Sequence, residues 1–317
     1  MPASPITTAE ARIIDPVQST YARGYTQAGF VGDLLFPSVP IATRGAKRIE
    51  FTKDSFKRAN SRRAPGTPVQ QHMMGFEGKP VNLHQEALAA VTPFEHQEEA
   101  GATLGLNLHM DGLDETMDIL TLSKEIEQAT VATTAANYAA AHVDTPAGTD
   151  LWTDDASKPK EQISDAKETI RRKIGRKPNT MILSPTAFTA LDNHPALFDI
   201  IKRSGGNAVT TDLLARFFDM ERVAIGEAVE AADDDTLTDV WGNGVVLAFV
   251  SPPSGGNRRS RRRPSFGYTH QLQNYPVVTE TYWNRGINSF QSDVFDEWSA
   301  DMVGPDAGYL ITTTDGN

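Results

Sequence analysis

The chain has 317 residues, of which 39% are hydrophobic and 22% charged, and its formal net charge at pH 7 is -11. This length and composition allow a buried core of one large or two modest domains and lie outside the disordered class. The sequence has no apolar run of about 18 residues and no secretory signal pattern, so we expect a protein made in the cytosol without membrane contact. It has no cysteine, which excludes disulfides, thiol nucleophiles and thiolate zinc sites.

The first 90 residues predict parts that extend from a body. Residues 1–45 are interrupted at close intervals by glycine and proline, which is typical of an arm that docks on other parts. In residues 46–90, Ile49 and Phe51 alternate with charged residues, and a second extended run follows near Val81. This pattern predicts a long hairpin with little apolar content. Because such hairpins are marginally stable alone, we expect it to lie on something else.

Residues 110–141 predict one long helix. They contain no proline and a single glycine. Apolar or small residues recur at steps of three and four and form a helical stripe: Ile119, Leu122, Ile126, Ala129, Thr133, Ala136 and Ala140. Asp111, Asp114, Glu115 and Asp118 place negative charge in the first turns, where the helix dipole favours it. At 1.5 Å per residue the helix would extend roughly 48 Å, so we expect a structural spine.

Residues 160–260 alternate helical patterns with short apolar strands, which predicts a small α/β lobe. Ser184 followed by Pro185 is typical of a helix start, with Ser184 as the cap. A strand-like tail with aromatic residues follows from residue 265 to 314. The expected helices include 160–174 and 210–218, and the expected strands are 180–184, 222–226 and 245–250.

This order of parts resembles the major capsid proteins of tailed bacteriophages, which have the Hong Kong 97-type fold. The resemblance is closest from Asn179 to Val229, where a strand runs into "SP", a helix ends at "HP" and "AIGEAV" precedes "WGNGVVLAF". It implies an α+β fold with these parts: an N-arm (1–45), an extended E-loop hairpin (46–90), a peripheral domain (91–159) with a spine helix (110–141), an α/β axial domain (160–260), and C-terminal strands (261–317) that return to the peripheral domain.

The resemblance also implies a function. It implies a major capsid protein that self-assembles into pentamers and hexamers and forms the icosahedral head around the double-stranded DNA genome of a tailed phage. The protein would be found in the virion after assembly in the host bacterial cytoplasm. Its expected partners are further copies of itself, a separate scaffolding protein, a portal, a cement protein and loosely held lumenal DNA, with no membrane. Two alternatives stay open: an encapsulin-like cage, which shares the fold, and a small α/β enzyme, supported only by the lobe.

Two segments of opposite charge indicate how copies would meet. From Arg44 to Lys79 the sequence has nine basic and three acidic residues, a net of +6. From Glu95 to Glu127 it has nine acidic residues and one basic residue, a net of -8. If the hairpin crosses a neighbour's spine helix, as the resemblance implies, many weak pairs would set register and partner choice; the alternative is that both are solvated faces. The expected contacts are Lys53, Lys57, Arg58, Arg62 and Arg63 of the hairpin with Asp111, Asp114, Glu115 and Asp118 of the spine.

A run of arginines has three possible roles. Arg258, Arg259, Arg261, Arg262 and Arg263 lie in a loop rich in proline, glycine and serine, so a solvated loop is the first interpretation. The second is pairing with the acidic segment Glu227–Asp239. If the strands at 222–226 and 245–250 form a hairpin, these two segments leave opposite ends, and the pairing would be between subunits. The third is lumenal contact with packaged DNA.

Catalytic patterns are weak. The sequence contains no HExxH, GxSxG, phosphate-binding loop or GxGxxG, and its seven histidines show no metal-ligand spacing. "SKPK" at Ser157–Lys160 matches S-x-x-K without its partner motifs. Asp233–Asp235 lack an EF-hand pattern. We therefore expect no enzyme, no cofactor and no metal site.

Overall fold

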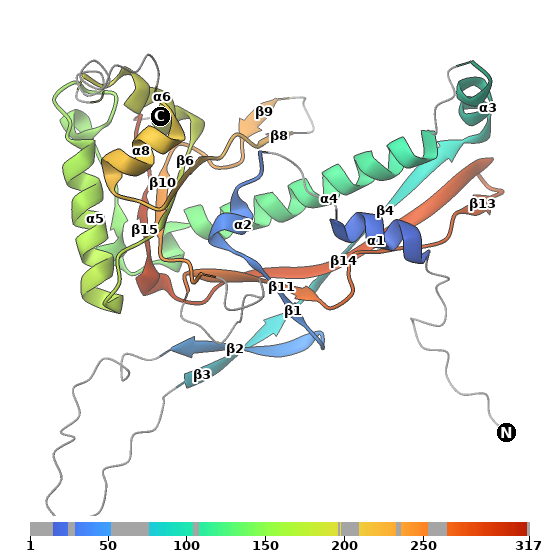
Figure 1. The fold of residues 1–317 in the computed structure, drawn as a ribbon, viewed down its shortest axis with the longest axis horizontal. Helices are drawn as coiled ribbons and strands as arrows, with labels where there is room; N and C mark the ends of the chain where they lie inside the picture. Colours follow the sequence, from blue (N-terminus) through green and yellow to red (C-terminus); the bar gives the residue numbers. More distant parts are fainter. Residues whose placement is uncertain are drawn as a thin grey trace, which may run out of the picture.

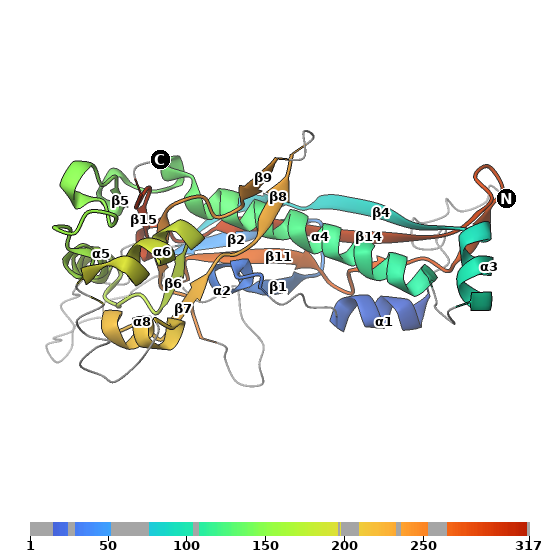
Figure 2. The ribbon, with the colours of Figure 1, turned by 90° about the horizontal axis from the view of Figure 1, so that it is seen from above.

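The computed structural model describes residues 15–24, 29–51, 76–103, 108–195, 197, 209–232, 236–252 and 265–315. These parts form an elongated molecule with an α/β lobe at one end (Figure 1). A long sheet runs from the lobe to the other end, and the helix α4 lies along it in both views (Figures 1 and 2). Within the described residues, no helix combines the length and apolar character needed to cross a bilayer.

The long sheet is built around one strand, β14 (Ser289–Met302). Along one edge β14 pairs antiparallel with β4 (His84–Pro93) over ten positions. Its other edge pairs with three shorter strands, so β14 has neighbours on both edges and is the central strand of the sheet. The remaining strands are β11 (Gly267–Leu272), β12 (Val277–Val278), β13 (Tyr282–Asn284) and β1 (Ser38–Ile41), which runs parallel to β11.

The N-terminal arm packs on this sheet. Besides β1 it contributes α1 (Pro16–Gly24) and α2 (Gly32–Leu35). The Ser19 hydroxyl donates to the backbone oxygen of Val278 and accepts from its amide, at 3.2 and 3.0 Å, which holds α1 beside β12. Leu35 and Phe36 are fully buried, so the described part of the arm belongs to the core of its own chain.

The spine helix α4 (Leu108–Thr133) begins near the start of the predicted helix 110–141, but it ends earlier, at Thr133. Leu113, Met117 and Leu120 pack against Val294 and Trp298 of β14. The stripe predicted from spacing is wrong in its first half, since Ile119 is 47% exposed, and it is confirmed at Ala129, which is buried. The helix ends at Thr133 because side chains take over its last carbonyl groups: the Asn137 amide donates to Val131 O, and the Tyr138 hydroxyl donates to Ala132 O. Short 3-10 turns follow at Ala135–Asn137 and Ala140–His142.

The α/β lobe contains a five-stranded sheet in the order β5-β15-β10-β6-β7. Ile163 and Ile170 of α5 pack with Met181 and Val245 on one face, while Ala129 at the end of α4 packs with the side chains of the other face. The predicted cap is confirmed, since Ser184 Oγ accepts from the Ala187 amide at 3.1 Å. The elements are α5 (Pro159–Ile174), α6 (Pro185–Asn193), α8 (Thr211–Phe218), β5 (Val143–Asp144), β6 (Thr180–Leu183), β7 (Arg222–Ile225), β10 (Val245–Ala248) and β15 (Gly308–Ile311).

Two expectations about the lobe differ from its topology. The expected hairpin of 222–226 with 245–250 does not form, because β6 lies between β7 and β10. The C-terminal strands do not all return to the long sheet either: β15 pairs with β10 in the lobe. Both differences follow from burial. β10 is buried at every position, so it needs a paired strand on each edge, and β15 and β6 supply them.

A separate two-stranded hairpin projects from the body (Figure 1). It pairs β2 (Gly45–Phe51) with β3 (Phe76–Asn82) in antiparallel register, at the place where the sequence predicts a long hairpin. Val81 is buried where β3 meets β14. A second small hairpin, β8 (Val229–Ala231) with β9 (Leu237–Asp239), lies at the opposite edge of the molecule in Figure 1.

Candidate assembly interface

The base of the β2–β3 hairpin is fixed to the long sheet by one ion pair. Arg44, which directly precedes β2, donates from Nε and Nη2 to the two carboxylate oxygens of Glu297 at 2.7 and 2.6 Å. Glu297 is 1% exposed and lies on β14. The hydrogen bonds to Glu297 raise the pKa of Arg44 further above its ordinary value. Such a two-pronged pair fixes direction as well as distance, so it sets the angle at which the hairpin leaves the body.

The sequence prediction for the hairpin is only partly covered by the structure. Lys53, Lys57, Arg58, Arg62 and Arg63 lie outside the described residues. Arg44, counted with them as a basic residue of the hairpin, binds within its own chain. The sequence could not separate it from the others, because its partner Glu297 is 253 positions away.

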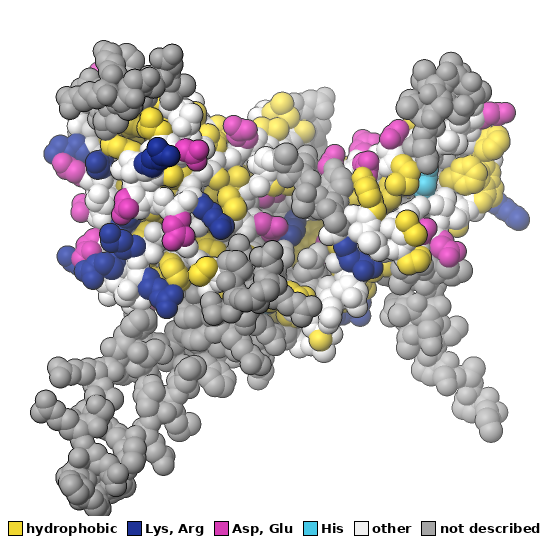
Figure 3. Space-filling view, viewed as in Figure 1, with side chains coloured by type: hydrophobic (Ala, Val, Ile, Leu, Met, Phe, Trp, Pro, Cys, Tyr) yellow, Lys and Arg dark blue, Asp and Glu magenta, His cyan; other side chains and the backbone are white. Residues whose placement is uncertain are grey.

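The four predicted acidic residues of the spine differ in their surroundings. Asp111 and Glu115 are exposed on α4, whereas Asp114 and Asp118 are half-buried. Asp114 accepts a hydrogen bond from the Tyr21 hydroxyl of α1 at 2.8 Å, and this bond raises the pKa of Tyr21. Of these four residues, Asp111 and Glu115 are therefore the two that are most open to a neighbouring molecule. Figure 3 shows acidic side chains along the edge of the molecule over α4.

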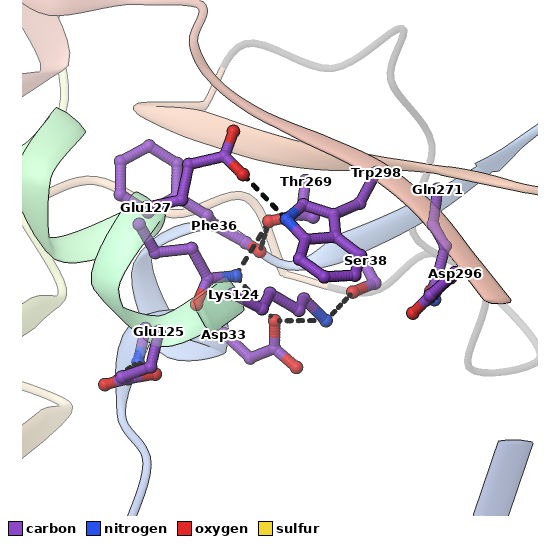
Figure 4. Close-up of polar contacts among 12 residues, drawn as sticks. Asp33, Phe36, Ser38, Lys124, Glu125, Glu127, Thr269, Gln271, Asp296 and Trp298 are labelled. Carbon is purple, nitrogen blue, oxygen red and sulfur yellow. Dashed lines mark hydrogen bonds and ion pairs between the residues drawn. The ribbon is translucent and has the colours of Figure 1, made fainter. Parts of the chain in front are cut away.

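Three further polar residues of α4 tie the spine to the arm and the long sheet (Figure 4). Glu127 accepts from the Trp298 indole at 2.6 Å and from the Ala300 amide at 2.8 Å. The Gln128 amide donates to Asp33 at 2.9 Å and to Thr269 at 2.8 Å, and Lys124 reaches Asp33 and Ser38. Glu127, Gln128 and Lys124 thus hold the spine helix to other parts of its own chain.

Glu125 is the most deeply placed of these carboxylates. It is 2% exposed, and it accepts from the backbone amides of Val31 and Gly32 and from the Trp241 indole at 2.8 to 3.0 Å. Burial raises the pKa of Glu125 although these donors act in the opposite direction. The sequence analysis missed this role. The available signal was its spacing, because Glu125 lies four and seven residues before Ala129 and Ala132 on the buried stripe of α4.

The arginine run Arg258–Arg263 lies outside the described residues, but the residues on either side of it are placed. Asn179 donates to Val250 O and accepts from Val250 N, and the Ser251 amide donates to Ser265 Oγ. Ser251 and Ser265, which are described on either side of the run, therefore lie at the Asn179 end of β6. The acidic segment Glu227–Asp239 starts at the other end of β6, where Gly226 bonds to Leu183. The hairpin from which opposite ends were inferred does not form. Because the arginine run lies outside the described residues, its pairing with the acidic segment stays a prediction.

The serine of the S-x-x-K match in the sequence lies in a buried contact of the lobe. Ser157 of the S-x-x-K match bonds to His194 at 3.1 Å, and this buried pair joins the loop before α5 to the end of α6. As the sequence predicts, His194 ends a helix. Across the ranges described above, no cluster of three or more histidine or acidic side chains could hold a metal ion.

An elongated fold with a projecting hairpin, a spine helix and charged edges defines a structural protein of a viral shell. The chain belongs to the family described as phage major capsid protein E, whose model matches residues 121–283. It is 34% identical over 307 residues to the major capsid protein of Burkholderia phage BcepMu, covering 96% of this chain and 98% of that protein.

Solved structures agree with this family. A phage-related protein from Bordetella bronchiseptica RB50 is 35% identical, with a TM-score of 0.81 over 96% of this chain and 98% of that one. The capsid structure of the cyanophage P-SCSP1u shares the fold at 11% identity, with a TM-score of 0.53 over 92% of this chain and 91% of that chain. The chain is thus a phage major capsid protein with the Hong Kong 97-type fold, a component of the virion capsid and not an enzyme.

Proposed function

We propose that the chain assembles into pentamers and hexamers that close an icosahedral head around double-stranded DNA. The observation that carries this proposal is the β2–β3 hairpin. It projects from the body on a fixed base, and the sheet it forms has only two strands. Because such a hairpin is marginally stable alone, a neighbouring subunit is the surface that would complete it.

The contact that we propose joins the basic hairpin of one subunit to the acidic spine of the next. The segment from Arg44 to Lys79 has a net charge of +6, and Asp111 and Glu115 present exposed carboxylates on α4. Each exposed pair contributes about 0–1 kcal/mol, but the contact recurs at every subunit of a closed shell. Lys53, Lys57, Arg58, Arg62 and Arg63 would supply the positive side, with Asp114 and Asp118 at the margin of the negative side.

Further partners follow from the same role. For such a head we propose a separate scaffolding protein, a portal and a cement protein as further chains. DNA would lie loosely against the lumenal side, since a protein with a net charge of -11 repels phosphate at long range. Tight phosphate binding at every subunit would also hinder packaging and release.

The test is negative-stain electron microscopy of the chain expressed alone and with its neighbouring genes. Closed icosahedral shells or hollow tubes are expected, and small globular particles under both conditions would refute the proposal. The variant Arg62→Glu with Arg63→Glu should impair shell formation while leaving the unfolding midpoint unchanged. Lys158→Glu is the matched control, because Lys158, directly before α5, is 68% exposed and lies in the lobe, away from the hairpin.

A further inference from the structure

The α/β lobe has one strongly basic end, which lies where α5 finishes. Five of the seven residues from Arg171 to Lys177 are basic, and all five are exposed. Arg222, also exposed, starts β7 beside them, because β7 runs parallel to β6 and Arg222 is level with Thr180. Figure 3 shows Lys and Arg side chains gathered over the α5 side of the lobe. We call these residues the basic end: Arg171, Arg172, Lys173, Arg176, Lys177 and Arg222.

The carboxylates within the chain neutralise only part of this charge. Arg171 and Arg172 share a single partner, Glu168, at 2.6 and 2.9 Å. Lys177 pairs with Asp219, which also binds Lys167. Arg176 lies over the ring of Phe249 at 5.2 Å, so its charge is held at the surface by an aromatic contact and not by a carboxylate. The basic end therefore keeps an excess of positive charge.

The opposite end of the same sheet is acidic. Residues 227–232 and 236–239, the acidic hairpin, contain β8 and β9, carry three carboxylates and have no lysine or arginine. Glu227, Glu230 and Asp239 are exposed. The acidic hairpin also exposes apolar side chains, since Leu237 is 67% and Val229 46% exposed. These two side chains share one face of the hairpin, because Val229 pairs with Asp239 and Ala231 with Leu237.

The two ends cannot meet within one subunit. Thr180 marks the basic end of β6 and Leu183 its acidic end, and the chain enters the acidic hairpin from the Leu183 end. In a ring, every subunit presents two different surfaces that meet head to tail. A lobe that is basic at one end and acidic at the other satisfies this requirement. The aliphatic stems of arginine and lysine would also cover the exposed Leu237 and Val229.

We propose that the basic end of each lobe docks on the acidic hairpin of a second copy of this chain, as the contact between lobes within a pentamer or hexamer. This inference rests on the ring assemblies proposed above. It adds a second charged contact to the one between hairpin and spine, with different residues on both sides. It also assigns a role to a cluster that the sequence analysis did not single out, although the run "RRKIGRK" is visible there.

Cross-linking tests the contact directly, because the natural chain has no cysteine. A full-length chain with Lys173→Cys and Glu230→Cys is assembled and treated with a short bis-maleimide. A ladder of covalent oligomers that ends at the ring size is expected. The control pair Lys158→Cys with Glu230→Cys should give no ladder, because Lys158 lies at the other end of α5. Intact shells without a ladder overturn the inference and leave the proposed function standing, whereas a natural chain that forms no particles overturns the proposed function.

Charge reversal separates this contact from binding to DNA. Arg172→Glu with Lys173→Glu should raise the protein concentration needed for assembly by about tenfold, and Glu227→Lys with Glu230→Lys should do the same. Combining the four changes should restore assembly, and circular dichroism confirms that each variant folds. If the basic variant assembles normally but protects less DNA from nuclease, and the acidic variant has no effect, the basic end contacts DNA and the inference is wrong.

Discussion

Arg44 and Glu297 join the base of the projecting hairpin to the central strand of the long sheet. Their side chains form two parallel hydrogen bonds of 2.7 and 2.6 Å, and the Glu297 side chain is buried while the Arg44 side chain is 59% exposed. The pair lies at the point where the chain leaves the body for the hairpin. It therefore fixes the orientation of the β2–β3 hairpin relative to β14, and this hairpin is the element that would contact another subunit.

We expect Arg44→Ala to lower the free energy of unfolding by about 1–2 kcal/mol, because it leaves the buried Glu297 without its partner. Arg44→Lys keeps the charge but loses the two-pronged geometry, so a smaller loss is expected. Urea unfolding gives the free energies, and hydrogen exchange gives the local effect. Amides of β2 and β3 should exchange faster in Arg44→Ala, while those of α8 should not change. The exposed Arg285→Ala is the control. Equal exchange in β2 and β3 of both variants would show that the pair does not hold the hairpin.

Glu125 has the largest structural role of the spine carboxylates, and we expect Glu125→Ala to cost about 3–5 kcal/mol of unfolding free energy. The reason is that the Val31 and Gly32 amides and the Trp241 indole would be left buried without an acceptor. Glu125→Gln retains one acceptor oxygen, but its amino group faces the Gly32 amide, so a loss of about 1–2 kcal/mol is expected. A smaller loss for Ala than for Gln in urea unfolding would contradict this account.

The pH dependence of the same residue has a defined sign. Burial raises the pKa of Glu125 above its ordinary value of 4.5, so the folded state holds the proton more tightly than the unfolded state does. The stability from this group is complete below about pH 4.5 and is lost as the pH rises through the folded pKa. Relative to Glu125→Gln, the natural chain should therefore lose stability across that window, which urea unfolding at successive pH values would measure. A gap between the two curves that stays constant with pH would contradict the shift.

The sequence allowed us to predict the elements whose patterns are local. Ser184 before Pro185 fixes a helix start, and the buried runs at 180–183 and 245–248 could only be strands or core helix. The sequence could not show contacts between residues that are far apart along the chain. The end of α4 depends on Tyr138 and Asn137 folding back on its carbonyl groups, and the place of β15 depends on a free edge of β10.

At the candidate site, too, the sequence predicted what is local and missed what depends on distant residues. A count of charges in the sequence separates a basic segment from an acidic one, but it treats every member alike. Arg44 is exposed, but the structure pairs its charge with Glu297 of the same chain, and Glu125 lies in the core. Burial of a charged side chain depends on donors from other elements, which no local pattern encodes.

The exposed spine carboxylates provide a prediction about assembly. We expect Asp111→Asn with Glu115→Gln to raise the protein concentration needed for shell formation several-fold, since these residues face solvent in the subunit. The unfolding free energy should fall by no more than about 0.5–1 kcal/mol, from the weaker helix dipole interaction. Light scattering follows assembly. Asp212→Asn is the matched control, because Asp212 is also exposed in the first turn of a helix, α8, but lies in the lobe. Equal effects on assembly from both variants would remove the spine from the interface.

Added salt should weaken the charged contacts between subunits more than the charged contacts within one subunit. Exposed charges more than a Debye length apart are screened, and this length falls from about 10 Å at 0.1 M salt to about 3 Å at 1 M. We therefore expect sodium chloride to slow and weaken assembly of purified subunits in light scattering. The free energy of unfolding should change less over the same range of salt concentration. The reason is that Glu297 and Glu125, which make contacts within the subunit, are buried and therefore screened less. If added salt instead promotes assembly at constant subunit stability, apolar contacts dominate the interface, and the charged segments are solvated faces.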